Sequence, residues 1–318
     1  SVEWLTRLRW KKMITVKALK PRFQNRVKPT LARQTRRAIA GVIALTSCLW
    51  LPAALGWSAT GHQLTCEVAA SQLTDPVKAR IQVLMQALPD AQRDDLFDGK
   101  ALTFADLCTW ADQVRPLKQY RSVASWHYVN VARDASSVNY DKCVTGCLLT
   151  AIETHIGLLQ QTELSPWPRL QSLMFLSHWI GDLHQPLHVS FFEDLGGNRT
   201  QVTGYDDCAN LHGVWDFCLV STTGKSRSDL LVELLALPGA EGFDQGTALS
   251  WAQESMDLVT HPRVQYCRKS ELGCAPWSTQ RYALSPDYQA INWPVAKLRL
   301  AQAGYRLAGL MNTLMAAP

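Results

Sequence analysis

Three histidines and one aspartate stand in the stretch HWIGDLHQPLH, which runs from His178 to His188 and is otherwise mostly apolar. The apolar spacing before it predicts a helix that continues to Pro186, so His178 and Asp182, four residues apart, lie on one helical face. Two side chains placed in this way can bind one metal ion. The proline ends the helix and lets His188 turn toward a different ion. A histidine on its own in such a place is more often a hydrogen-bonded core residue, so other clusters decide between the two interpretations.

Other parts of the chain supply further histidines and aspartates. His212 and Asp216 in NLHGVWD repeat the four-residue spacing. Asp112 in TWADQVR and His127 in SWHYVN form another pair, and WSATGH contributes His62. Neutral imidazole and carboxylate are the ligands that zinc prefers outside cysteine sites. Because the cysteines lack the CxxC spacing of a zinc ribbon, we expect a metal that is held by histidine and aspartate.

Charge is divided unevenly along the chain. Of its 32 Lys and Arg and 27 Asp and Glu, twelve basic residues and one acidic residue lie in residues 1–56, which leaves 20 basic and 26 acidic residues in 57–318. The acidic excess of the larger part disfavours tight non-specific binding of duplex nucleic acid.

Residues 1–56 have the order of a secretory signal peptide. A basic region is followed by the uncharged stretch 38–55 and by the small residues AALG before Trp57. We expect cleavage before Trp57 and a secreted or periplasmic protein that is free of the membrane. An uncleaved anchor is the alternative, because eighteen apolar residues are near the minimum for a membrane span. A lipoprotein box ending at Cys48 is a further alternative, and the long basic region suggests Met13 as the start.

The remaining residues, 57–318, are expected to form one mainly helical domain. Segments such as DPVKARIQVLMQAL and GCLLTAIETHIGLLQQ have apolar residues at i, i+3 and i+4, and SWHYVNVA is the best candidate for a strand. Apart from Cys48 there are eight cysteines, an even number that suggests disulfides in an exported chain. Local pairs 143–147, 208–218 and 267–274 are compatible with the spacing, which leaves the pairing open.

A series of motifs resembles the S1/P1 nuclease family. They are, in chain order, WSATGH, WADQVR, WHYVN, GCLLTAI, HWIGDLHQPLH, GGN, NLHGVWD and AGYRLA, and they cover nearly all of residues 57–318. The resemblance implies an all-α, single-domain S1/P1 nuclease or zinc phospholipase C-like fold with a metal cleft. It also implies zinc-dependent cleavage of single-stranded DNA and RNA to 5′-mononucleotides, with 3′-nucleotidase activity and no stable protein partner.

The resemblance further implies three zinc ions per chain. Their ligands would be Asp112, His127, His178 and Asp182 for the first ion; Trp57, His62 and Asp182 for the second; and His188, His212 and Asp216 for the third. Asp182 would bridge the first two ions, and His184 would have a supporting role without binding metal. Trp57 would bind through its backbone amine and carbonyl, which requires that the leader is removed. An α-amine has a pKa of roughly 7.7–8.0 and must lose its proton to bind, so zinc loading should weaken in acid.

Catalytic roles follow from the same resemblance. Asp112 would orient the attacking water, and Arg115 would contact the phosphate with its planar set of donors; a solvated surface arginine is the alternative for Arg115. Tyr128 would stack on a base, with a buried core tyrosine as its alternative. Three residues of the GGN loop together with one asparagine in a neighbouring motif would form the base pocket, unless the loop is a plain turn: Asn130, Gly196, Gly197 and Asn198. The fungal members have aspartate in place of Asn130, which leaves the base preference open.

Two other functions compete with the nuclease. Zinc phospholipases C resemble this order of ligands, but they have a longer gap between the terminal Trp and the first His and a Glu as the last carboxylate. WSATGH and Asp216 therefore favour the nuclease. A noncatalytic secreted zinc-binding protein is the second alternative, and the presence of all nine ligand positions disfavours it.

Overall fold

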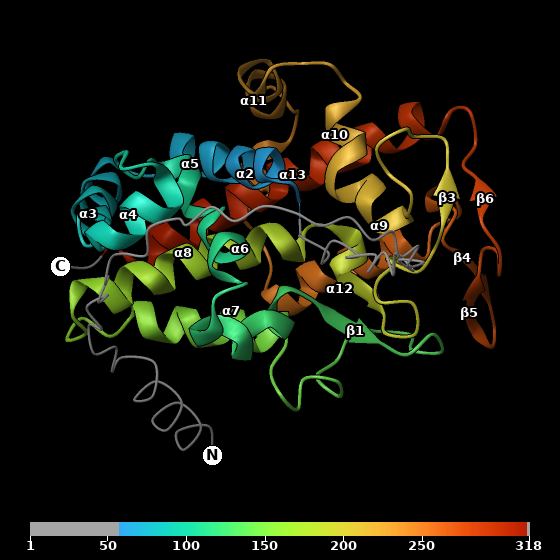
Figure 1. Cartoon of the computed structure of the whole chain (residues 1–318), viewed down its shortest axis with the longest axis horizontal. Helices are drawn as coiled ribbons and strands as arrows, with labels where there is room; N and C mark the ends of the chain where they lie inside the picture. The colour runs from blue at the N-terminus through green and yellow to red at the C-terminus, as the bar shows by residue number, and fades with distance from the viewer. Residues whose placement is uncertain (1–56, 317–318) are drawn as a thin grey trace, which may run out of the picture. The chain divides into compact units, whose positions relative to one another are not determined.

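The computed structural model describes residues 57–316, and the structural statements below concern that part of the chain. The predictions for the signal peptide 1–56, for lipidation at Cys48 and for a start at Met13 lie outside the described residues. Helices account for most of residues 57–316 (Figure 1), which confirms the mainly helical fold class. None of these helices is both long enough and apolar enough to cross a lipid bilayer.

The centre of the fold is helix α8 (Pro166–Leu183), which carries His178 and Asp182. It begins with a proline, which is favoured at the first helical position, and every residue from 170 to 183 is buried. A helix that is buried on all sides must be surrounded by other elements. In Figure 1, α8 runs between α7 (Leu148–Leu159) and the pair formed by α2 (Ala59–Gln72) and α13 (Tyr288–Leu314), all of which contact it. The two polar side chains are thereby placed inside the core.

Helices α2 and α13 approach each other closely at one glycine. A Cβ atom added to Gly304 would lie 2.5 Å from Cβ of Val68 and 2.9 Å from the carbonyl oxygen of Thr65. Only glycine allows this distance, because any larger residue would push the helices apart. The close packing holds α2, and with it His62, against the core.

The other elements are short. The remaining α-helices are α3 (Asp75–Met85), α4 (Asp90–Phe97), α5 (Phe104–Leu107), α6 (Trp110–Val114), α9 (Leu211–Gly213), α10 (Leu219–Ser221), α11 (Arg227–Leu235) and α12 (Ala248–Val259). The single-turn and irregular helices are η1 (Lys118–His127), η2 (Pro186–His188), η3 (Val214–Cys218), η4 (Ala240–Gly242) and η5 (Pro262–Val264), of which η3 is a π-helix. The paired strands are β1 (Val129–Val131) with β2 (Val189–Phe191), β3 (Val202–Thr203) with β6 (Tyr282–Ala283), and β4 (Cys267–Ser270) with β5 (Gly273–Pro276).

The pair β1 and β2 matters for the site. The strands are parallel, with Val129 opposite Val189, so the segments that lead into them lie side by side. His127 stands two residues before β1 and His188 directly before β2, and the His188 ring donates from Nδ1 to the His127 carbonyl at 2.5 Å. The strand predicted at SWHYVNVA is shorter than expected, because His127 ends the η1 helix and the strand begins only at Val129.

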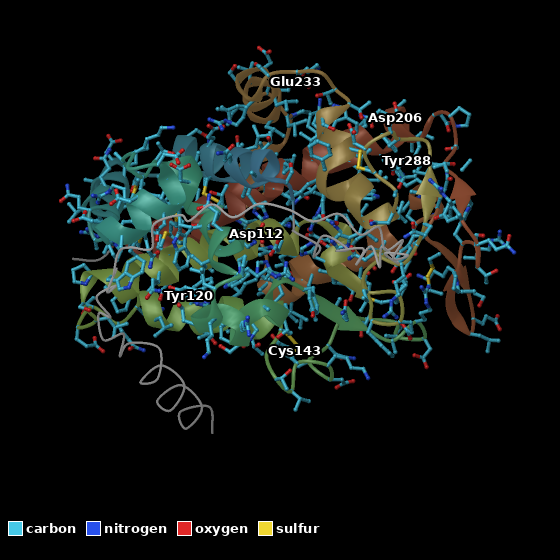
Figure 2. The ribbon with its side chains drawn as sticks, viewed as in Figure 1. Asp112, Tyr120, Cys143, Asp206, Glu233 and Tyr288 are labelled. Carbon is cyan, nitrogen blue, oxygen red and sulfur yellow. A yellow bond between two sulfur atoms is a disulfide. The ribbon has the colours of Figure 1, made fainter. Side chains whose placement is uncertain are left out.

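Four disulfides connect the helices and loops. The three local pairs are present, at Cys143–Cys147, Cys208–Cys218 and Cys267–Cys274, and Figure 2 labels Cys143. The fourth, Cys66–Cys108, joins α2 to the segment between α5 and α6 and closes a loop of 42 residues. Spacing alone does not indicate this pair, because its partners meet only through the packing of α2.

A partly buried ion network joins α12 to α13. Arg299 and Arg306 are almost fully buried, and both bind the carboxylate of Glu254, Arg306 with two nitrogens at 2.6 and 2.7 Å. Arg306 also lies 2.8 Å from Nε2 of His184, whose Nδ1 bonds to the carbonyl of Ile180 at 2.7 Å. His184 thus ties the end of α8 to α13, as expected for a supporting residue.

This network predicts a pH-dependent stability. Burial acts to raise the pKa of Glu254, but Arg306 and Arg299 outweigh it and lower the pKa below its ordinary value of 4.5. A lowered folded-state pKa contributes stability above pH 4.5 that is lost as the pH falls through the folded value. Breaking a fully buried ion pair by removing one partner typically costs ~3–5 kcal/mol. We expect Glu254→Gln to lower the unfolding free energy at pH 7 by less than this, because the carboxylate is 40% exposed.

The measurement is urea denaturation at pH 7 and at pH 3.5, with chelator present so that metal loss does not contribute. The difference between wild type and Glu254→Gln should shrink at the lower pH. Glu271→Gln, at an exposed glutamate, is the control and should match wild type. An equal difference at both pH values would contradict the assignment of the charge effect to Glu254.

Candidate metal centre

Eight histidines and aspartates from seven helical segments come together in the core. They form three groups, each with ligand atoms within 4.8 Å of one another: first Asp112, His127 and His178; second His62, His178 and Asp182; and third His188, His212 and Asp216. The structure therefore brings together every predicted metal-binding side chain. Figure 2 labels Asp112, which has the most exposed side chain in the first two groups.

Asp112 and two histidines define the first group. Asp112 Oδ1 lies 3.6 Å from both His127 Nδ1 and His178 Nε2, and these two nitrogens are 3.1 Å apart. The Asp112 side chain is 16% exposed, while both histidines are buried. This group is thus open to solvent on the side of Asp112.

The carboxylate of Asp182 lies between this group and His62. Its Oδ2 is 3.0 Å from His127 Nδ1 and 3.1 Å from His178 Nε2, whereas its Oδ1 is 3.3 Å from His62 Nε2. The two oxygens therefore face different groups of nitrogens. Such a placement suits a carboxylate that binds two ions, and the bridging role stays a prediction.

The third group is next to the β1–β2 pair. His212 Nε2 is 3.2 Å from Asp216 Oδ2, and His188 Nε2 is 3.9 Å from Asp216 Oδ1. The spacing of four residues between His212 and Asp216 is kept although the segment passes from α9 into the π-helix η3. His188 Nδ1 lies 3.5 Å from Asp182 Oδ1, so the third group adjoins the other two.

Backbone carbonyls orient three of the imidazoles. His178 Nδ1 lies 2.6 Å from the carbonyl of Cys108, and His212 Nδ1 lies 2.6 Å from the carbonyl of Gly196. His188 Nδ1 bonds to His127 as described above. An N–H donated from Nδ1 leaves Nε2 with its lone pair directed into the group, which is the arrangement of a metal-binding histidine.

The residues fit a metal ion, because several of their buried ligand atoms have no hydrogen-bond partner. Among residues 57–316, buried ligand atoms without a hydrogen-bond partner occur in all three groups: His62 Nδ1 and Nε2, Asp112 Oδ1, Asp182 Oδ1, His188 Nε2 and His212 Nε2. Proteins seldom leave buried polar atoms unsatisfied, because each costs about 1–3 kcal/mol. A divalent ion that is bound by imidazole and carboxylate would satisfy them, and zinc suits this donor set.

The pKa shifts of His178 and Asp216 also indicate that this cluster favours a positive charge among its carboxylates. Burial acts to lower the pKa of His178, but Asp182 and Asp112 outweigh it and raise the pKa to about 9. Burial raises the pKa of Asp216 to about 6, because a charge in this position is poorly solvated. In the absence of metal a proton on His178 balances the carboxylates, and a bound ion would displace it.

Trp57 lies at the edge of the centre. Its side chain is fully buried, and the neighbouring amide of Ser58 donates to the carbonyl of Asp216 at 2.7 Å. The start of the described chain is thereby held beside the third group. Binding of an ion by the Trp57 backbone stays a prediction.

The predicted substrate residues lie around the centre. Tyr128 is 37% exposed, which contradicts the alternative of a buried core tyrosine. Asn130 is half-buried in β1. Asn198 donates to the carbonyl of Leu195 at 2.8 Å within a turn that contains Gly196 and Gly197 and that contacts His212. Arg115, half-buried, follows α6 three residues after Asp112, and its contact with phosphate stays a prediction.

Two positioning residues are not indicated by the sequence. Gln185 donates from Nε2 to Asp216 Oδ1 and accepts from the amide of Leu187 at 2.6 Å, so it links the third group to the η2 turn. Gly181 faces His62, and a Cβ atom added there would lie 2.7 Å from His62 Nδ1. In the sequence, a polar residue inside HQPLH and a glycine inside IGDL are the features that could have drawn attention to them. Neither feature predicts a contact, because the contacts depend on how other segments pack.

Gly181 allows a direct test of this close approach. We expect Gly181→Ala to displace His62, to destabilise the protein by about 1–3 kcal/mol and to reduce the metal content, because the added methyl group overlaps the imidazole. Gly157→Ala in α7 is the matched control, since an added Cβ there meets nothing within 4 Å. Without a steric conflict it should stabilise by about 0.5–1 kcal/mol. Thermal unfolding and elemental analysis give both readouts, and normal metal content in Gly181→Ala would contradict the expectation.

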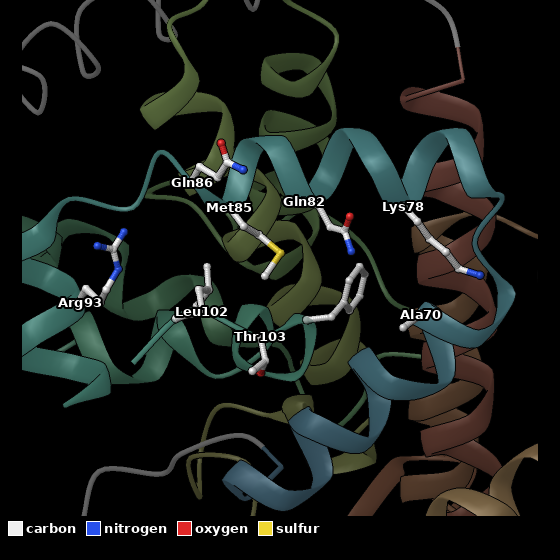
Figure 3. Close-up of a pocket in the computed structure, with 10 residues that line it drawn as sticks. Ala70, Lys78, Gln82, Met85, Gln86, Arg93, Leu102 and Thr103 are labelled. Atoms are coloured by element: carbon white, nitrogen blue, oxygen red, sulfur yellow. The ribbon is translucent and has the colours of Figure 1, made fainter. Parts of the chain in front are cut away.

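A cavity of about 520 Å³ lies elsewhere, among α2, α3 and the segment before α5 (Figure 3). Met85 and Leu102 line it together with Gln82, Lys78 and Arg93. The two cations are already paired with acidic neighbours, Lys78 with Asp75 and Arg93 with Asp90. No residue of the metal groups lines this cavity, so the candidate chemistry is at the histidine and aspartate cluster.

A mainly helical chain that buries histidines and aspartates from distant segments in one cluster has the architecture of a metal-dependent hydrolase. The family model described as S1/P1 Nuclease matches residues 57–316, and the chain belongs to this family. It is therefore an enzyme, a nuclease that hydrolyses phosphodiester bonds. This membership favours the nuclease over the phospholipase C and noncatalytic alternatives.

Curated relatives support the assignment over most of their length. Endonuclease 1 of Arabidopsis thaliana is 31% identical over 295 residues, which are 86% of this chain and 91% of that protein. Nuclease S1 of Aspergillus oryzae is 25% identical over 292 residues, 83% and 93% of the two chains. Nuclease P1 of Penicillium citrinum is 26% identical over 285 residues, 81% and 97%.

Proposed function

We propose that this protein uses three zinc ions to hydrolyse single-stranded DNA and RNA to 5′-mononucleotides, and that it also removes 3′-phosphates from nucleotides. The observation that carries the proposal is the continuous cluster of three histidine and aspartate groups, joined by Asp182. A cluster of this kind suits several ions that act on one phosphate, which is how two-metal nucleases stabilise the attacking and leaving oxygens.

The residues would divide the work as follows. Zinc ions, when bound, would lower the pKa of water to about 7 and neutralise charge on the phosphate. The Asp112 carboxylate, which is 16% exposed, can accept a hydrogen bond and would hold the attacking water in line with the phosphorus. Arg115 would donate to the phosphate oxygens, where a rigid set of donors stabilises the transition state.

Substrate selection would depend on residues beside the metal groups. The exposed ring of Tyr128 follows His127 directly and offers a stacking surface, typically worth ~1–3 kcal/mol per base and tolerant of any base. Asn130 and Asn198 would contact a base edge, and Gly196 and Gly197 would let the backbone approach it. A stacked base must be unpaired, so this arrangement favours single strands and 3′-nucleotides.

The proposed location is outside the cytoplasm, after removal of residues 1–56. Four disulfides in residues 57–316 support it, because disulfides form and persist mainly in oxidising compartments. Metal binding by the Trp57 amine would make removal of the leader a condition for full activity.

The decisive experiment assays the purified mature protein on single-stranded DNA, a 3′-nucleotide and phosphatidylcholine, with and without chelator, and counts zinc per chain. We expect hydrolysis of the first two substrates, 5′-phosphate products, complete loss with chelator and recovery with zinc. Hydrolysis of the lipid alone, or activity that chelator does not change, would overturn the proposal.

A further inference from the structure

The loop beside the third group has an unusual backbone. Three consecutive residues have positive φ, Leu195 at 57°, Gly196 at 65° and Gly197 at 82°. Glycine adopts this conformation readily, but leucine is disfavoured there, and its side chain is 49% exposed and so gains little from packing. A strained segment of this kind persists only where its surroundings hold it in place.

The carboxylate of Asp194 holds the loop. Its Oδ1 accepts from the amide of Gly197 at 3.0 Å and from the hydroxyl of Tyr266. Its Oδ2 accepts from Arg133 Nη2 at 2.7 Å and from the hydroxyl of Thr200 at 3.1 Å. Four donors around one carboxylate that is only 15% exposed give it a single orientation.

The two larger donors are themselves fixed. Arg133 Nη1 donates to the carbonyl of Cys274 at 3.0 Å, and its guanidinium lies over the ring of Phe191 at 4.7 Å. Tyr266 is buried and precedes Cys267, which the disulfide joins to Cys274. Asp194 is therefore anchored to the β4–β5 hairpin and to the end of β2.

The loop in turn holds His212, a predicted zinc ligand. The carbonyl of Gly196 accepts from His212 Nδ1 at 2.6 Å, and the carbonyl of Gly197 accepts from the His212 amide at 3.4 Å. A Cβ atom at Gly196 would lie 2.6 Å from the carbonyl of Leu187, the residue before His188. The loop thus holds the His212 imidazole directly and packs against the backbone next to His188.

We propose that Asp194 is a positioning residue of the third metal site, which acts through the Gly196 carbonyl to keep His212 Nε2 directed at the ion. The inference deepens the proposed function and rests on it. Partners that orient a ligating histidine typically contribute 10–100-fold to metal affinity or activity. The loop that Asp194 holds bonds to His212, a predicted ligand of the third ion, so the effect should be selective for that ion.

The test is zinc affinity, measured by competition with a graded series of chelators, for wild type and Asp194→Asn. We expect wild type to hold three ions and Asp194→Asn to hold two with unchanged affinity and the third about 10–100-fold more weakly. Activity should return when zinc is raised by the same factor. Glu193→Gln, at the exposed neighbouring acid, removes the same charge and should behave as wild type.

Tyr266→Phe removes one donor from the carboxylate and gives a second reading if Asp194→Asn fails to fold. We expect a weaker effect on the same ion. Three ions held with wild-type affinity in the folded variants, even with a lower melting temperature, would overturn the inference and leave the proposed function intact. A wild-type chain that holds one ion at most would overturn the proposed function, and the inference with it.

Discussion

Replacing Asp182 by asparagine is expected to release two zinc ions and to lower kcat/KM on single-stranded DNA on the order of 10³-fold or more, since the charge stabilisation of two ions is lost together. Its two oxygens face His127 and His178 on one side and His62 on the other. An amide offers one uncharged oxygen in place of two that share a negative charge. The nitrogen of the amide would turn toward one of the groups and cannot bind an ion there.

Asp216→Asn is the matched comparison, because it makes the same chemical change at a carboxylate that contacts only His212 and His188 among the predicted ligands. We expect it to release one ion and to lower activity less. Elemental analysis after gel filtration counts the ions, and circular dichroism shows that both variants fold. Equal zinc content in the two variants would contradict a bridging role for Asp182.

Keeping a single residue of the leader is expected to have the second largest effect on zinc content and activity. A mature chain that starts at Trp57 should bind three zinc ions, and a chain that starts at Gly56 should bind two and lose activity on the order of 10²-fold. The reason is that Gly56 converts the Trp57 amine into an amide, whose nitrogen has no lone pair for zinc. The buried Trp57 side chain and the bond from Ser58 to Asp216 leave this end little freedom to adjust.

The readouts are the zinc content and kcat/KM of the two chains, prepared in parallel and checked by N-terminal sequencing. A chain that carries one extra glycine at its C-terminus is the control for added length and should match the chain that starts at Trp57. Full zinc loading of the chain that starts at Gly56 would remove Trp57 from the ligands.

Local patterns were enough to predict the helical class and several side-chain pairs. The apolar spacing of SLMFLSHWIGDL predicted a buried helix, and helical geometry alone places His178 beside Asp182. The same argument holds for His212 and Asp216, even though the backbone there includes a π-helix. These features depend on residues within one or two turns, whose distances are set by the helix itself.

Long-range contacts decided the rest. The pairing of β1 with β2 sets His188 against His127, and neither three-residue strand can be predicted with its partner from sequence. Cys66 meets Cys108 only because α2 packs against α5 and α8. The roles of Gly181 and Asp194 depend on which side chain or loop approaches them from a distant part of the chain.

The sequence by itself therefore determined the residue types of the candidate metal groups, their four-residue spacings and the family, because each resides in short continuous motifs. The tertiary structure alone decided that the three groups adjoin one another, that Asp182 turns one oxygen to each side, and that a carboxylate outside the groups holds the loop at His212. The physical reason is that ligand chemistry belongs to individual side chains. Their mutual distances depend on close packing between segments that are far apart in the chain.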